Sequence, residues 1–126
     1  MRHTKEDGWI GCDFDGTLIR HGGWDNTTHD LLQAHPIKPM IERVRTWLAE
    51  GYEVKIFTAN AGNAKREHYI INWCVENLGQ QLEITNAKDH RVLELWDDHN
   101  VAVEEDTGRI LGGAGRWVKS VQRLLF

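Results

Sequence analysis

Short apolar runs alternate with segments of helical period along most of this chain, and that alternation limits the folds it can adopt. Five runs have the length and the residue types of strands: 8–14, 54–58, 82–84, 92–96 and 101–103. Strands that alternate with helices favour a parallel sheet covered by helices on both faces. We therefore expect an α/β fold with a Rossmann-like parallel sheet of about five strands, sandwiched between helices.

Two segments repeat apolar residues at helical spacing. The first begins at Pro39, a residue favoured in the first turn of a helix, and ends at Gly51. The second ends at Gly79, and its predicted buried stripe consists of Ile70, Ile71, Cys74, Val75 and Leu78. A last amphipathic segment is predicted after residues 112–115.

Composition indicates a single domain, 1–126, which can bury a core without disulfides. No apolar run is long enough to span a membrane. The polar N-terminus lacks the apolar core of a secretory signal, and Cys12 and Cys74 lack the spacing of a metal or redox motif. A cytoplasmic location is therefore expected. The formal net charge of −4 argues against binding to duplex DNA.

Polar residues follow four of the five predicted strands. They are, in chain order, Asp13 and Asp15, Thr58, Lys88, and the pair Asp97 and Asp98. In open parallel sheets, ligands bind beyond the carboxyl ends of the strands, so these side chains are expected at one edge. Carboxylates held close together repel unless a cation or a proton lies between them. The pattern therefore predicts a divalent metal site, and a metal beside a carboxylate nucleophile predicts phosphoryl chemistry.

The most specific motif is residues 13–18, Asp-Phe-Asp-Gly-Thr-Leu, which directly follows apolar residues of the first predicted strand. Together with the later threonine, lysine and aspartate pair, it resembles the haloacid dehalogenase superfamily, whose members are mostly magnesium-dependent phosphatases. The resemblance extends over residues 8–103. The segment Trp73-Cys74 and the pair Lys88-Asp89 make the chain similar to short, capless bacterial and phage members.

This resemblance implies a catalytic role for each of four residues. Asp13 would be the nucleophile that forms an aspartyl-phosphate, and Asp15 would protonate the leaving oxygen and later activate water. Thr58 would hydrogen-bond the transferring phosphoryl group, and Lys88 would neutralise its charge. An aspartate at position 15 favours hydrolysis over a lasting phospho-aspartate.

The resemblance also implies a Mg²⁺ ion held by Asp13, the backbone carbonyl of Asp15, and Asp97, with Asp98 nearby. The residue types agree, because oxygen ligands without histidine or cysteine favour a hard cation over zinc. A carboxylate attacks an anionic phosphate only when their repulsion is screened, which Mg²⁺ and Lys88 would do together. Mg²⁺ is thus the expected cofactor, and a phosphorylated compound is the expected partner.

The turn Thr58-Ala59-Asn60 is expected to bind substrate together with Lys88. Related short members often have arginine after the alanine, whereas this chain has Asn60. A substrate contact made by a guanidinium at that position is therefore in question.

The chain has no room for a cap domain over the site. Only residues 19–38 separate the first motif from the first helix, and one helix nearly fills 59–87. We expect 19–38 to form a loop or small hairpin, with Trp24 as a partial lid on an open site. An open site suits a phosphate on a large partner, such as a polynucleotide end or a phosphoprotein, or a site closed by a second copy in a homo-oligomer. Nucleotides and sugar phosphates also stay open as substrates.

Two other functions fit part of the pattern. A phosphorelay receiver also uses Asp, Asp-Asp, Thr and Lys on a similar sheet, but it places its acidic pair first, whereas here the pair comes last. A catalytically idle interaction module could keep the same fold.

The sequence indicates no metal-binding or catalytic role for the histidines and cysteines. The seven histidines lie mostly in predicted loops, so we expect solvated side chains rather than metal ligands. Cys12 is expected to face the core, away from Asp13, because side chains alternate along a strand.

Overall fold

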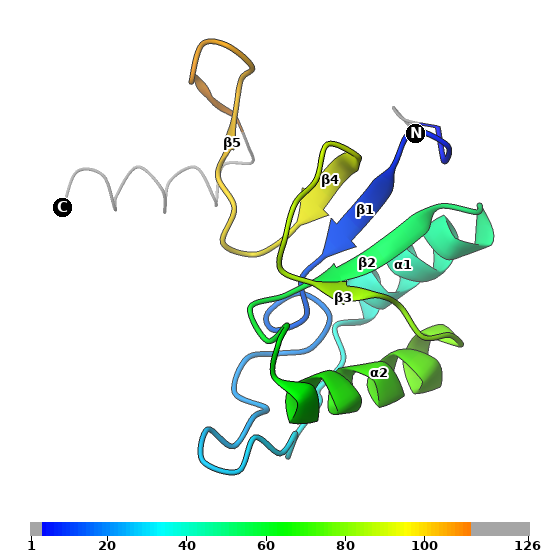
Figure 1. Ribbon diagram of the computed structural model, residues 1–126, viewed down its shortest axis with the longest axis vertical. Helices are drawn as coiled ribbons and strands as arrows, with labels where there is room; N and C mark the ends of the chain where they lie inside the picture. The colour runs from blue at the N-terminus through cyan, green and yellow to red at the C-terminus, as the bar shows by residue number, and fades with distance from the viewer. Residues whose placement is uncertain (1–3, 112–126) are drawn as a thin grey trace, which may run out of the picture.

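The computed structural model describes residues 4–111 (Figure 1). Its elements, in chain order, are β1 (Trp9–Cys12), α1 (Lys38–Ala49), β2 (Glu53–Phe57), α2 (Ala64–Leu78), β3 (Ile84–Thr85), β4 (Val92–Trp96), β5 (Ala102–Val103) and β6 (Ile110–Leu111). The amphipathic segment predicted after residue 112 lies outside the described residues. No helix within 4–111 has the length and apolar character needed to cross a membrane.

Four strands form one parallel sheet in the order β3-β2-β1-β4. The α/β fold with a parallel sheet is therefore confirmed. Because β1 lies between β2 and β4, the residues that follow these three strands meet at one edge of the sheet. The third strand starts later than predicted, at Ile84, and Leu82 belongs to the preceding connection, where it is buried in the core.

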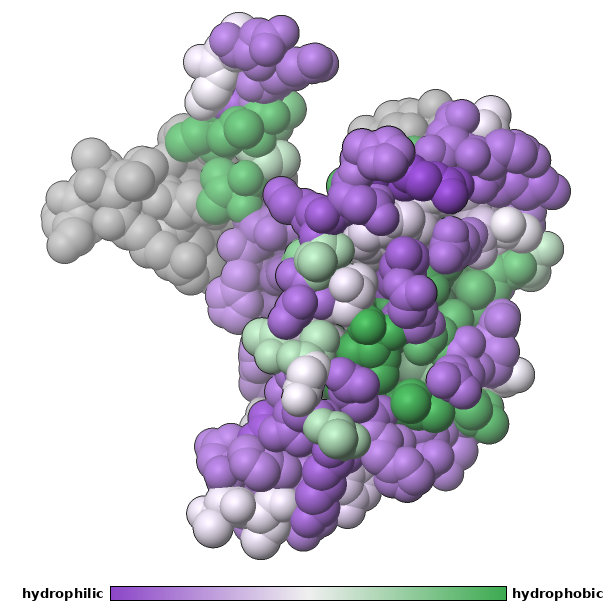
Figure 2. Space-filling view, viewed as in Figure 1, coloured by the Kyte–Doolittle hydropathy of each residue, from purple (hydrophilic) through white to green (hydrophobic). Residues whose placement is uncertain are grey.

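The fifth predicted strand does not join this sheet. β5 pairs antiparallel with β6 in a separate hairpin, which stands away from the sheet in Figure 1. Positive φ angles at Asp106 and Gly108 turn the chain back, so residues 110–111 become the partner. Apolar side chains show on this hairpin in Figure 2, and Val103 is 58% exposed. The prediction of about five strands is therefore wrong: within 4–111 the sheet has four.

Both helices cover the same face of the sheet. Their buried side chains share one apolar core with Ile10 and Cys12 of β1 and with Val54 and Ile56 of β2. Cys12 is fully buried there, which confirms that it faces the core.

The opposite face carries no helix within residues 4–111, so the expected sandwich is wrong for this part of the chain. The connection 86–91 between β3 and β4 is too short to form a crossover helix. It runs past Trp9, whose indole N–H donates to Asp89 at 2.9 Å and whose backbone N–H donates to the Arg91 carbonyl at 3.0 Å. The Lys55 ammonium lies 4.6 Å from the centre of the same indole ring.

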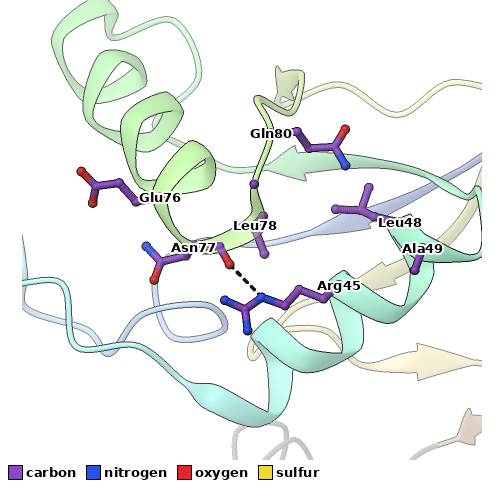
Figure 3. A pocket seen from close by; sticks show the side chains of 8 residues that line it. Arg45, Leu48, Ala49, Glu76, Asn77, Leu78 and Gln80 are labelled. Atoms are coloured by element: carbon purple, nitrogen blue, oxygen red, sulfur yellow. Dashed lines mark hydrogen bonds between the residues drawn. The ribbon is translucent and has the colours of Figure 1, made fainter.

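The helices begin and end close to where the sequence predicts. Pro39 lies in the first turn of α1. Asn63 caps α2 by accepting a hydrogen bond from the Arg66 backbone N–H at 3.0 Å, and Gly79 ends it in the left-handed conformation. At the other end of the helix pair, Arg45 donates Nε–H to the Asn77 carbonyl at 2.9 Å across a groove between α1 and α2 (Figure 3). This groove adjoins the amino ends of the strands, away from the predicted site.

Residues 19–37 form the expected small hairpin, which we call the flap. Isolated bridges pair Ile19 with Pro36 and Trp24 with Leu31. The flap therefore leaves the first motif and returns beside it before α1 begins.

Candidate acidic site

Three carboxylates lie together at the carboxyl edge of the sheet. The backbone N–H of Asp13 donates to the Trp96 carbonyl at 2.9 Å, which places the end of β1 against the end of β4. Asp13, Asp97 and Asp98 consequently each offer an oxygen, and these oxygens lie within 4.8 Å of one another. We call these three residues the acidic cluster. The convergence predicted for these aspartates is confirmed.

Gly16 allows this close approach. Its φ of 81° lies in the left-handed region, which favours glycine. A Cβ at this position would overlap Nε2 of His21 and lie 2.5 Å from Oδ2 of Asp98. The glycine of the first motif is thus required both by the turn and by the side chains packed on it.

The electrostatics of the cluster favour bound positive charge. Burial raises the pKa of Asp13 to about 7, against an ordinary value of 3.8, and the charges of Asp97, Asp98 and Asp15 act in the same direction. The backbone N–H of Phe14, which donates to Oδ1 of Asp13 at 2.8 Å, opposes the shift. A divalent cation would favour the ionised form of Asp13.

Asp98 has an unsatisfied oxygen beside two histidines. Its Oδ2 lies 2.8 Å from Nε2 of His21. Its Oδ1 is buried and accepts no hydrogen bond within the described residues, although Nδ1 of His99 lies 3.2 Å away. Burial acts to raise the pKa of Asp98, but the hydrogen bond with His21 and the charge of His99 outweigh it and lower the pKa. Because a buried polar atom normally has a partner, Oδ1 fits a cation ligand.

The two histidines were missed by the sequence analysis. The side chains of His21 and His99 are 59% and 61% exposed, so they are solvated as expected, but both pair with Asp98. Contrary to the expectation that they are no metal ligands, their ring nitrogens and an oxygen of Asp98 lie within 4.8 Å of one another, close enough to share a metal ion. His99 directly follows the aspartate pair, and that adjacency was the available signal. No sequence spacing indicated that the flap would bring His21 to the same carboxylate.

Asp15 is held by two uncharged donors from different segments. The indole N–H of Trp24, in the flap, donates to Oδ1 at 2.8 Å. The side-chain amide of Asn60, after β2, donates to Oδ2 at 2.8 Å. Each carboxylate oxygen keeps a second lone pair, so the side chain can still accept a proton from water.

Thr58 lies at the carboxyl end of β2, as predicted, and is only 3% exposed. Its hydroxyl accepts the Asn60 backbone N–H at 3.1 Å, which shapes the turn through the exposed residue Ala59. The structure therefore connects Thr58 to Asp15 through Asn60.

Lys88 makes no direct contact with the acidic cluster among the described residues. It is exposed in the connection 86–91, and within residues 4–111 no hydrogen bond or ion pair joins it to Asp13, Asp97 or Asp98. Its predicted role as a phosphate-neutralising group has no contact in this structure to support it.

The flap is anchored to α2 rather than standing open. Asp30 accepts hydrogen bonds from Lys65 at 2.9 Å and from the Tyr69 hydroxyl at 2.8 Å. The Trp24 and Tyr69 rings meet edge to face, with centroids 6.1 Å apart. The Tyr69 ring thereby packs against Trp24, which donates to Asp15.

Replacing Asp30 by Asn is expected to loosen the flap with little change in Tm. The hydrogen bonds from Lys65 and Tyr69 lower the pKa of Asp30 to about 2 from 3.8. The anchor is therefore complete above pH 4 and is lost as the pH falls toward 2. Exposed ion pairs contribute little to global stability. Hydrogen exchange at neutral pH should become faster in flap peptides but not in β1. Unchanged flap exchange would show that the ion pair does not hold the flap.

Comparison with known proteins adds no relative: no family model, curated protein or solved structure matches this chain.

Proposed function

We propose that this chain is a Mg²⁺-dependent phosphomonoesterase of the capless haloacid dehalogenase type, acting through an aspartyl-phosphate on Asp13. One observation carries the proposal: the acidic cluster joins Asp13 of the Asp-x-Asp-Gly-Thr motif to two aspartates that lie more than eighty residues later in the chain, within 4.8 Å. Three carboxylates this close together repel one another, and a cation or a proton between them would offset that repulsion.

The donor set fits Mg²⁺. Asp13, Asp97 and Asp98 offer only carboxylate oxygens, and Oδ1 of Asp98 is buried and accepts no hydrogen bond within residues 4–111, with Nδ1 of His99 3.2 Å away. These residues and the backbone carbonyl of Asp15 would hold the ion, which would neutralise charge on the phosphate.

The remaining chemistry belongs to the protein's own residues. A carboxylate oxygen of Asp13 forms a bond to phosphorus as the ester P–O bond breaks, and Asp15 gives a proton to the departing alcohol. Asp15 then takes a proton from water as the water oxygen attacks the phosphorus, which releases inorganic phosphate and restores Asp13. Trp24 and Asn60 keep Asp15 oriented for both proton transfers.

The open edge favours a large or exposed phosphate group as substrate. Within residues 4–111 the flap is the only insertion next to the first motif, and it contains no helix of its own. Nucleotides, phosphorylated oligonucleotide ends and phosphopeptides should therefore be compared with small sugar phosphates in one screen of the purified chain.

The activity itself is tested with p-nitrophenyl phosphate. Hydrolysis that requires Mg²⁺ and stops with EDTA would support the phosphatase. Stable phosphorylation by acetyl phosphate without turnover would instead indicate a receiver. Inertness toward both compounds would indicate an interaction module.

Mg²⁺ is expected to raise Tm more at pH 8 than at pH 5. The folded-state pKa of Asp13, about 7, exceeds its ordinary value of 3.8. The stability of the metal-free protein contributed by this group is thus complete below about pH 4 and is lost as the pH rises through 7. A cation that binds the ionised carboxylate of Asp13 stabilises the folded protein at those pH values at which this carboxylate is charged. Thermal melts with Mg²⁺ and with EDTA at both pH values measure this, and equal shifts would contradict it.

A further inference from the structure

The two residues that hold Asp15 share a third contact, Arg66, in the first turn of α2. Its Nη1 donates to Oδ1 of Asn60 at 3.0 Å. Its guanidinium carbon lies 4.9 Å from the centre of the Trp24 ring, a cation–π distance. One guanidinium therefore contacts both donors to Asp15.

Arg66 is itself fixed by the flap. Its Nε donates to Nδ1 of His29 at 3.0 Å, and its Nη2 donates to Oδ1 of Asn26 at 3.1 Å. Each guanidinium nitrogen thus has a partner, and the planar group has one orientation. A lysine ammonium could not satisfy these directions together.

The contact with Asn60 decides which way its amide faces. Arg66 has only donors, so it selects the oxygen of the amide, and the NH₂ group is left to face Asp15. Without Arg66, the side-chain amide of Asn60 could rotate by half a turn and place its oxygen against the carboxylate of Asp15. The two oxygens would repel each other. Trp24 would likewise lose the cation that packs against its ring.

We propose that Arg66 is a positioning residue for Asp15: through Asn60 and Trp24 it fixes both carboxylate oxygens for proton transfer. This inference rests on the proposed phosphatase function. Related short members often have an arginine at the position of Asn60. In this chain Arg66 brings a guanidinium to the same turn, where it acts on Asp15 rather than on the substrate.

The test compares leaving groups. p-Nitrophenolate departs with little need of a proton, whereas the alcohol of β-glycerol phosphate needs one. For Arg66→Gln, we expect kcat/KM toward β-glycerol phosphate to fall about 10-fold or more, a part of the 10²–10⁴-fold available to positioned acid–base catalysis. The kcat/KM toward p-nitrophenyl phosphate should change less than about threefold, because it reports the steps up to loss of the leaving group.

Lys65→Gln is the matched control. Lys65 is the adjacent residue and also anchors the flap, through Asp30 and the Thr28 carbonyl, but within residues 4–111 no hydrogen bond or ion pair joins it to Trp24 or Asn60. It therefore controls for loosening of the flap as a whole. It should not separate the two substrates. Equal losses on both substrates for Arg66→Gln, or no loss on either, would overturn the positioning role while leaving the phosphatase intact.

A second measurement does not depend on activity. The indole N–H of Trp24, assigned with Trp24→Phe, should exchange with solvent faster in Arg66→Gln than in the unmodified chain or in Lys65→Gln. Unchanged exchange would overturn the proposal. An unmodified chain that is inactive on both phosphates would instead count against the proposed function.

Discussion

Replacing Asp13 by Asn is expected to lower kcat for p-nitrophenyl phosphate by at least about 10³-fold, since the amide cannot form the aspartyl-phosphate. The substitution keeps the shape of the side chain. Its oxygen can still accept the Phe14 backbone N–H, which contacts Oδ1 of Asp13 at 2.8 Å. The loss should therefore appear in kcat rather than in folding, and steady-state kinetics at saturating Mg²⁺ measure it.

The same variant should be more stable than the original when metal is absent. Burial and the charges of Asp97, Asp98 and Asp15 disfavour ionised Asp13, and an amide has no such charge. We expect the Tm of Asp13→Asn at pH 8 without metal to exceed that of the original chain, with a smaller shift on adding Mg²⁺. Lower stability together with lost activity would leave no reason to assign Asp13 as the nucleophile, because unfolding would explain both.

The elements of the fold that local chemistry determines were predicted closely. As expected, Pro39 lies in the first turn of α1 and Gly79 directly follows α2. Proline suits the first helical turn, and glycine suits the left-handed conformation after the last turn. Periodicity was less reliable for single positions. Val75, predicted in the buried stripe, is 51% exposed, and the buried residues of α2 are instead Ile70, Trp73, Cys74 and Leu78.

Strand pairing was harder to predict than strand position. Residues 101–103 are apolar enough for a central strand, but apolarity does not say which partner a strand takes. A turn with positive φ at Asp106 and Gly108 offered a partner nearby, and the local hairpin formed instead. The missing crossover helix follows from the length of 86–91 and could have been noticed in the sequence.

In the candidate site, too, some contacts could be predicted from strand positions and others could not. Asp13, Asp97 and Asp98 converge because parallel strands end at one edge, and strand positions suffice to predict that. The partners of Asp15 depend on the path of the flap, which has no periodicity to interpret. Trp24 was singled out as a partial lid, but its hydrogen bond to Asp15 and its contacts with Tyr69 and Arg66 were not predicted.

Asp15→Asn is expected to slow turnover of p-nitrophenyl phosphate by about 10²–10⁴-fold while allowing the first chemical step. An amide cannot take a proton from water, so the aspartyl-phosphate on Asp13 should persist. The new side chain would also turn an NH₂ group toward either Trp24 or Asn60. Both of these residues are donors there, so one hydrogen bond to residue 15 is lost and its side chain is held less firmly. Rapid mixing should show a burst of p-nitrophenolate close to one equivalent per chain, followed by slow release of phosphate.

The burst separates the two aspartates, because each has a different place in the reaction. Asp13→Asn should give no burst and no phosphorylated protein, whereas Asp15→Asn should give acid-quenched protein whose mass has increased by one phosphoryl group. Borohydride reduction of that adduct would locate it at residue 13. If Asp15→Asn were slow without a burst, attack by Asp13 would itself depend on Asp15. If neither variant were slow, the acidic cluster would not be the site of hydrolysis, and its three carboxylates would need another explanation, such as a structural cation.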